Sequence, residues 1–301
     1  MRYAAIDIGS NAVRLLIADI IRNDDVISFK KNTLVRVPLR LGDDAFIDRR
    51  ISEPKAEDLV KTMAAFRNLM DVYKVSKYMA CATSAMREAV NGASLLDVIN
   101  GAGIDLKIID GREEARIIYN SRIEQHLNNN KAYLYIDVGG GSTELSVFAD
   151  SKLVASASFN VGTIRILDNQ DREETWDEMR TWVKTHTKEF KAVYGIGTGG
   201  NINKLSRLAN NNKEDKPISF TKLKSLYQYL NSFSLKDRIN VLGLNHDRAD
   251  VIIPACEIFL TLMKAGRLRQ IIVPRVGLAD GIIQTLIDNS VTESLEEKKL
   301  E

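Results

Sequence analysis

The sequence has few cysteines and no long uncharged apolar run. Its two cysteines, Cys81 and Cys256, both lie in apolar stretches, which predicts buried free thiols in a reducing compartment. The longest apolar run, 251–263, contains Pro254 and Glu257 and is too short for a membrane-spanning helix. No signal peptide precedes the first strand-like stretch. These absences predict a soluble, cytoplasmic protein without a membrane partner.

An excess of charge of either sign is also lacking. The 42 Lys and Arg residues nearly balance the 40 Asp and Glu residues, for a net charge of +2. This balance argues against a nucleic acid as partner, and we interpret the local cluster Arg36, Arg40, Arg49 and Arg50 as a solvated basic loop. A length of 301 residues with 45% hydrophobic content fits about two domains with separate cores.

The most informative stretch is residues 133–144, YLYIDVGGGSTE, which predicts a buried strand, a glycine loop and a second strand. Peptide N–H groups of such a loop, with the hydroxyls of Ser142 and Thr143, suit the oxygens of a phosphate. The flanking acids Asp137 and Glu144 would repel a bare phosphate, so they indicate a divalent cation. The alternative is an ordinary β-hairpin with exposed acids.

The same arrangement occurs near the N-terminus, in residues 3–11, again followed by a strand-like run at 13–19. Asp7 and Asp137 are 137 − 7 = 130 positions apart, which is the spacing of domains. The repetition predicts two similar α/β domains, 1–127 and 128–301, that hold a phosphate ligand between them.

Three other segments carry polar groups after predicted strands. In residues 81–91, Thr83, Ser84 and Arg87 suit an anion at a helix N-terminus, although the segment by itself favours a simple helix cap. Glu113 and Glu114 open a helix, where adjacent side chains point about 100° apart, so only one of them faces any given site. Residues 193–201, VYGIGTGGN, form a third glycine-rich loop of the anion-binding type.

Four motifs together resemble the exopolyphosphatase / guanosine pentaphosphate phosphohydrolase family in its short, two-domain form. They are IDIGSN at 6–11, ATSAMR at 82–87, GREEAR at 111–116 and IDVGGGSTE at 136–144. The resemblance extends over about residues 2–287. It implies the α/β fold of actin and the sugar kinases: two similar lobes with an interlobe cleft, and a final helix that returns to the first lobe.

The resemblance also implies roles for individual residues. The second glutamate of its GREEAR motif, Glu114, matches the family's catalytic base. Asp137 and Glu144 match metal-associated acids, and Asp7 is grouped with them as a candidate ligand of Mg²⁺ or Mn²⁺. The residues that match phosphate-binding elements are Gly9, Ser10, Asn11, Arg87, Gly139, Gly140, Gly141, Ser142 and Thr143.

The implied reaction is hydrolysis of a terminal phosphoanhydride in inorganic polyphosphate or guanosine pentaphosphate. Two departures from the family pattern, Ala12 in place of a serine and Ala279 in place of an arginine, leave open a weakly active binder of guanosine polyphosphates. A phosphotransferase of the same fold is a further alternative function. For the assembly of the protein, a homodimer is left open.

Overall fold

The structure, a computed structural model, describes residues 1–23, 26–121, 131–150, 152–210, 216–274 and 276–300, of which 293–300 by their backbone alone. The chain forms two compact units, Met1–Arg122 with Val276–Glu301, and Ile123–Arg275. The expected domain boundary at 127/128 lies outside the described residues. The final segment belongs to the first unit, where the resemblance places the final helix, although the domain range expected from the sequence, 128–301, includes it.

The first unit is built on a five-stranded mixed sheet in the order β3-β2-β1-β4-β5. Its central strand β1 pairs antiparallel with β2 and parallel with β4. The strands are β1 (Arg2–Ile8), β2 (Val13–Asn23), β3 (Val26–Val37), β4 (Lys77–Ala82) and β5 (Leu106–Ile108). Six of the seven residues of β1 are buried, as expected for a strand covered on both faces.

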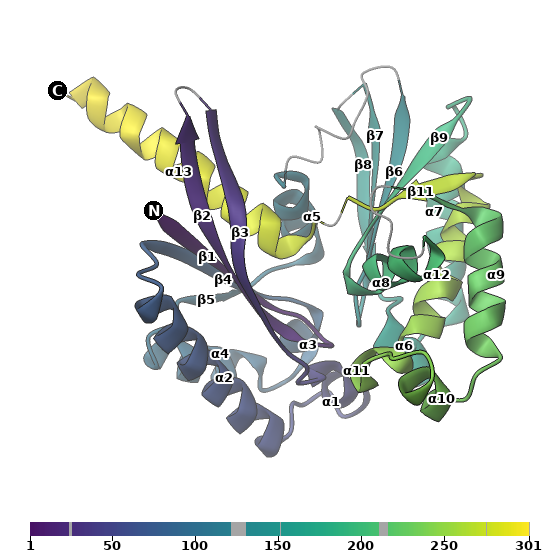
Figure 1. The fold of residues 1–301 in the computed structure, drawn as a ribbon, viewed down its shortest axis with the longest axis horizontal. Helices are drawn as coiled ribbons and strands as arrows, with labels where there is room; N and C mark the ends of the chain where they lie inside the picture. Colours follow the sequence, from purple (N-terminus) through teal and green to yellow (C-terminus); the bar gives the residue numbers. More distant parts are fainter. Residues whose placement is uncertain (24–25, 122–130, 151, 211–215, 275, 301) are drawn as a thin grey trace. The chain divides into compact units, whose positions relative to one another are not determined.

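Helices cover this sheet, and the last of them comes from the end of the chain (Figure 1). They are α1 (Leu41–Ile47), α2 (Glu53–Val72), α3 (Ser84–Glu88), α4 (Gly92–Gly101), α5 (Gly111–Tyr119) and α13 (Leu278–Leu300). Helix α13 packs against α5, β1, β4 and β2. The C-terminal helix is therefore part of the core of the N-terminal unit.

The second unit contains a six-stranded sheet in the order β10-β11-β9-β6-β7-β8. Its strands are β6 (Ala132–Val138), β7 (Thr143–Ala149), β8 (Lys152–Phe159), β9 (Val193–Thr198), β10 (Ile218–Ser219) and β11 (Gln270–Ile272). Strand β6 pairs antiparallel with β7 and parallel with β9. The sheet therefore repeats the pairing of β1 with β2 and β4.

Seven helices belong to the described part of this unit. They are α6 (Thr163–Leu167), α7 (Glu173–Thr187), α8 (Gly200–Ala209), α9 (Phe220–Asn231), α10 (Leu235–Asn240), α11 (His246–Ala249) and α12 (Ile252–Ala265). Helix α12 is the apolar centre, since Phe259, Leu262 and Met263 are buried in one cluster with residues of β6 and β7. Among the described residues, no helix has both the length and the apolar character needed to span a membrane.

The two units share one detail of backbone geometry at the end of their first strand. The N–H of Gly9 donates to the carbonyl of Ala12 at 3.2 Å, and the N–H of Gly139 donates to the carbonyl of Ser142 at 2.9 Å. Both turns connect a buried strand to its antiparallel neighbour. The predicted repetition of an α/β half is confirmed at the level of strand order and turn hydrogen bonding.

Candidate active site

In the first unit, three predicted site segments lie at one edge of the sheet. Strands β1, β4 and β5 are parallel, so their carboxyl ends lie on the same side of the sheet. The segments that follow them, 9–12, 83–84 and 109–114, all begin there. The Oγ atoms of Ser10 and Ser84 are 2.8 Å apart, and both side chains are buried. The structure therefore joins the first glycine loop to a junction that the sequence alone interpreted as a helix cap.

The N-terminus of α5 separates its two glutamates. The carboxylate of Asp110 caps the helix by accepting the N–H groups of Arg112 and Glu113, each at 2.8 Å. These backbone hydrogen bonds lower the pKa of Asp110. Glu113 is exposed, whereas Glu114 is only 9% exposed. The two glutamates thus face different surroundings, and Glu114 lies on the buried face of α5, together with Ile117 and Ile118.

Cys81 is a buried thiol in the strand next to that of Asp7. It lies opposite Asp7 in the parallel register of β1 and β4. Burial raises the pKa of the Cys81 thiol to about 12, and the negative charges of Asp7, Glu113 and Glu114 act in the same direction. The thiol stays protonated and serves as apolar packing.

Two cations hold the polar groups of this edge in place. Arg14 donates from Nη1 to Oδ2 of the buried Asp7 at 2.7 Å, so Asp7 already has a positive partner. Because Arg14 already balances the charge of Asp7, we assign Asp7 no role as a metal ligand. Arg87 donates from Nη1 to the carbonyl of Ile109 at 2.8 Å, which fixes its guanidinium beside the segment that leads to α5.

In the second unit, the glycine loop after β6 is held by its carbonyl groups. The carbonyl oxygens of Gly139, Gly140 and Gly141 accept, respectively, from Thr163 N at 3.1 Å, Ile164 N at 2.8 Å and Arg165 Nε at 2.6 Å. In a planar trans peptide the N–H points opposite to the C=O. The N–H groups of Gly140, Gly141 and Ser142 therefore point away from α6, as a set of donors suited to an anion.

This loop packs so closely on the start of α6 that glycine is required there. A Cβ on Gly162 would lie 2.3 Å from the carbonyl oxygen of Gly140, which no side chain tolerates without a shift of the backbone. Thr143 also has a structural bond, because its Oγ1 donates to the carbonyl of Val161 at 2.6 Å. Its hydroxyl proton is thus already used, and we do not retain Thr143 as a phosphate donor.

The acids of the second unit suit a cation that is shared with a phosphate. Asp137 and Glu144 are partners in the antiparallel register of β6 and β7, so their side chains emerge on the same face. Glu144 is buried and accepts from Ser158 Oγ at 2.9 Å. The described residues contain no cluster of three or more metal-ligating side chains. Mg²⁺ is commonly held by one or two carboxylates plus substrate phosphates, and Asp137 with Glu144 fits that pattern.

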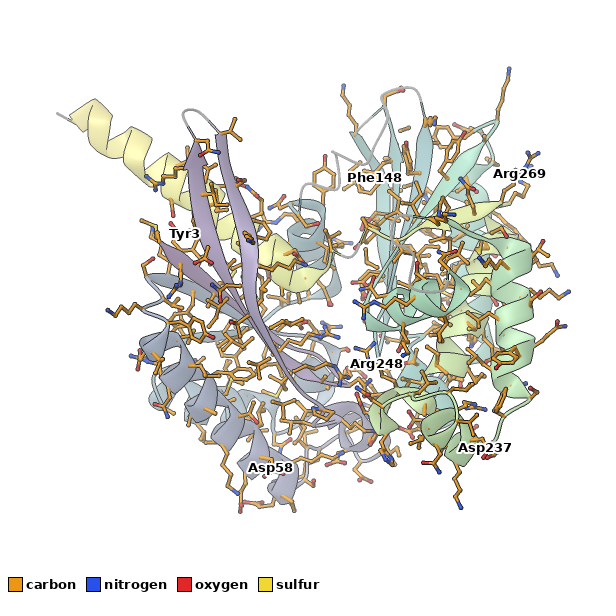
Figure 2. The ribbon with its side chains drawn as sticks, viewed as in Figure 1. Tyr3, Asp58, Phe148, Asp237, Arg248 and Arg269 are labelled. Atoms are coloured by element: carbon orange, nitrogen blue, oxygen red, sulfur yellow. The ribbon has the colours of Figure 1, made fainter. Side chains whose placement is uncertain are left out.

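The third glycine-rich loop lies beside the second. Thr198, at the end of β9, is opposite Asp137 in the parallel register, and its Oγ1 is 2.5 Å from the hydroxyl of Tyr135. Gly199 has a φ of 101°, and a Cβ there would lie 3.1 Å from Oδ1 of Asp137. Arg248, labelled in Figure 2, donates to the carbonyl of Gly200 at 2.5 Å. Sequence reasoning gave Arg248 no site role, because its anchoring function depends on a contact 48 positions away.

Taken together, these features define an α/β protein of two similar halves, each with a glycine turn at the carboxyl end of its first strand. A sequence profile described as the Ppx/GppA phosphatase family matches residues 33–290. The chain belongs to this family. The predicted resemblance is therefore confirmed.

Solved structures of the family confirm the fold. An exopolyphosphatase from Cytophaga hutchinsonii matches with a TM-score of 0.83 at 24% identity, over 96% of this chain and 98% of that one. The Ppx/GppA family member of Aquifex aeolicus matches with a TM-score of 0.75 at 25% identity, over 96% and 98%. The predicted fold class, α/β with two similar lobes, is confirmed, and the lobes have the fold of the Ppx/GppA structures.

Curated relatives cover the chain to different extents. It is 23% identical to exopolyphosphatase 1 of Mycobacterium leprae, over 96% of this chain and 90% of that protein. It is 28% identical to a bifunctional 3-dehydroquinate synthase/phosphatase of Fusobacterium nucleatum, over 83% of this chain. The match spans only 41% of that longer protein.

Proposed function

We propose that this chain hydrolyses terminal phosphoanhydride bonds and releases phosphate from inorganic polyphosphate or from the 5′ end of guanosine pentaphosphate. The observation that supports the proposal is that Glu114, a buried carboxylate in the first turn of α5, follows β5 at the same end of the sheet as the Ser10–Ser84 hydrogen bond. A carboxylate together with hydroxyl and N–H donors would combine a proton acceptor with an oxyanion site. The membership of a phosphatase family supports the same reaction class.

In the proposed reaction, Glu114 orients a water molecule and accepts its proton as the water oxygen attacks the terminal phosphorus in line. The new P–O bond forms while the bond to the bridging oxygen breaks, and that oxygen keeps the electron pair. The leaving group is a chain shorter by one phosphate. Arg87 and the N–H groups of Ser10 and Asn11 are the candidates to offset the charge on the phosphate oxygens, while the N–H of Gly9 closes the turn onto Ala12.

The loop of the second unit binds further phosphate oxygens in this proposal. The N–H groups of Gly140, Gly141 and Ser142 are the donors, because the bonds of the preceding carbonyls to α6 direct them away from that helix. Asp137, with Glu144 oriented by Ser158, would hold Mg²⁺ or Mn²⁺. When bound, such an ion neutralises phosphate charge and makes the phosphorus more electrophilic.

One assay separates this proposal from its alternatives. Purified protein is incubated with Mg²⁺ and either polyphosphate or guanosine pentaphosphate, and free phosphate is measured. Release of phosphate supports the hydrolase, whereas transfer to an added acceptor supports a phosphotransferase. Tight binding without turnover supports a regulator, for which Ala12 and Ala279 are the motivating departures; both are buried.

A further inference from the structure

A basic pocket lies in the second unit, apart from the glycine loops. It has a volume of about 470 Å³ and is lined by the C-terminal ends of α7 and α12. The lining residues are Lys184, Thr185, Lys188, Lys264, Ala265 and Arg267. Four of the six side chains are cations and none is an acid, so the pocket concentrates positive charge.

Among the described residues, these four cations form no ion pair. In the described part of the chain, no carboxylate oxygen lies within 4.0 Å of the charged nitrogens of Lys184, Lys188, Lys264 or Arg267. They are not needed to cap α12 either. The N–H groups of Gly266 and Leu268 already bond the carbonyls of Leu262 and Met263, at 2.9 and 2.8 Å.

The positive charge continues along the edge of the sheet. Strands β6, β9 and β11 are parallel, so their amino ends lie on the same side of the sheet as the pocket, and a cation precedes each of them. These cations are Lys131, Lys191 and Arg269. Figure 2 shows Arg269 projecting away from the ribbon near β11. Among the described residues of these turns the acids are Asp150 and Glu189, which the cations outnumber. In a chain with a net charge of only +2, this is a marked local segregation.

The composition of the pocket selects among anions. No aromatic side chain lines it, so it offers no platform on which a nucleic-acid base would stack. Lysine and arginine side chains instead bind phosphate oxygens through charge-assisted hydrogen bonds. We propose that this pocket binds the phosphate chain of inorganic polyphosphate, as a second contact for long chains. The proposal rests on the function proposed above.

The distance between this pocket and the glycine loop predicts a dependence on chain length. The loop follows the carboxyl end of β6, whereas the basic edge lies at its amino end. Strand β6 has 7 residues, which at ~3.3 Å per residue separates the two by about 23 Å. Tripolyphosphate is too short to reach both places. Only long chains gain the second contact, which acts by raising their effective concentration at the loop.

The test compares two double variants that remove the same charge. Lys188→Gln with Lys264→Gln removes two cations of the pocket, and Lys61→Gln with Lys236→Gln removes two exposed cations elsewhere. Binding of end-labelled long polyphosphate is measured by fluorescence anisotropy without divalent metal. We expect the pocket variant to bind roughly 2–30-fold more weakly than the wild type, from ~0.2–1 kcal/mol for each of the two charge contacts removed. The control variant is expected to bind like the wild type.

Turnover supplies the second measurement. The KM for long polyphosphate is expected to rise in the pocket variant, while the KM for tripolyphosphate stays unchanged. Equal binding by the two double variants would overturn the proposal, as would an equal rise of both KM values. Competition by single-stranded RNA as strong as that by polyphosphate would reassign the pocket to nucleic acid. If the wild type releases no phosphate, the proposed function fails, but the binding comparison still decides whether the pocket holds polyphosphate.

Discussion

Gly281 of α13 lies directly against Ile117 of α5. A Cβ on Gly281 would come within 1.9 Å of the carbonyl oxygen of Ile117, so the two helices touch through their backbones. The neighbouring Asp280 is buried and pairs with Lys31 of β3 at 2.6 Å. Burial raises the pKa of Asp280, and the charge of Lys31 opposes that rise. The C-terminal helix thereby supports the helix that carries Glu114.

Replacement of Gly281 tests this support. Gly281→Ala is expected to lower the free energy of unfolding by about 1–3 kcal/mol, because the added methyl group forces α13 and α5 apart. Urea unfolding measures this change, and kcat should fall with it as Glu114 moves. Gly277→Ala is the control, since a Cβ there has nothing within 4 Å. Equal stability of the two variants would contradict the close contact.

The role of Glu114 as base predicts an asymmetry between neighbours. Glu114→Gln is expected to lower kcat for phosphate release by roughly 10²–10⁴-fold, because an amide cannot accept the proton of water. Glu113→Gln should cost little, since that side chain is exposed. Steady-state kinetics with polyphosphate measure both, and circular dichroism checks that both fold. A wild-type rate in Glu114→Gln would exclude Glu114 as the base.

Asp137 is expected to determine the Mg²⁺ concentration that the enzyme needs for half-maximal activity. Asp137→Asn exchanges a charged ligand for a weaker neutral one, so the Mg²⁺ concentration for half-maximal activity should rise. A magnesium titration of the initial rate measures it. Asp150→Asn is a matched control at an exposed turn with a φ of 49°, a conformation that asparagine tolerates. Loss of activity with unchanged metal dependence would instead indicate a structural role for Asp137.

The glycine loop of the second unit depends on Gly162. Gly162→Ala is expected to raise the KM for polyphosphate at least several-fold, because the new methyl group displaces the carbonyl of Gly140 and turns the following N–H away from the ligand. Gly101→Ala is the control, as a Cβ there meets nothing within 4 Å. An unchanged KM, together with a wild-type melting temperature, would argue against phosphate binding by this loop.

The local units of this protein were predictable from its sequence. The alternation of buried strands and glycine turns around Asp7 and Asp137 predicted the two halves, because strand pairing across a short turn depends on neighbouring residues. The same patterns placed Ser10 and Gly139–Ser142 in turns at strand ends. Family resemblance then supplied the choice of Glu114 over Glu113, which the helical period by itself left open.

The tertiary structure decided how the segments combine. It brought Ser84 into hydrogen-bonding distance of Ser10 across 74 positions. It also paired Asp7 with Arg14, bonded the hydroxyl of Thr143 to the carbonyl of Val161, and fixed the glycine loop against the start of α6. It also packed α13 on α5, so that residues near 280 stabilise a helix near 115. The physical reason is that such contacts follow from which faces are buried together and how closely backbones approach. The sequence specifies these contacts only through the packing of the whole unit, not through any local pattern.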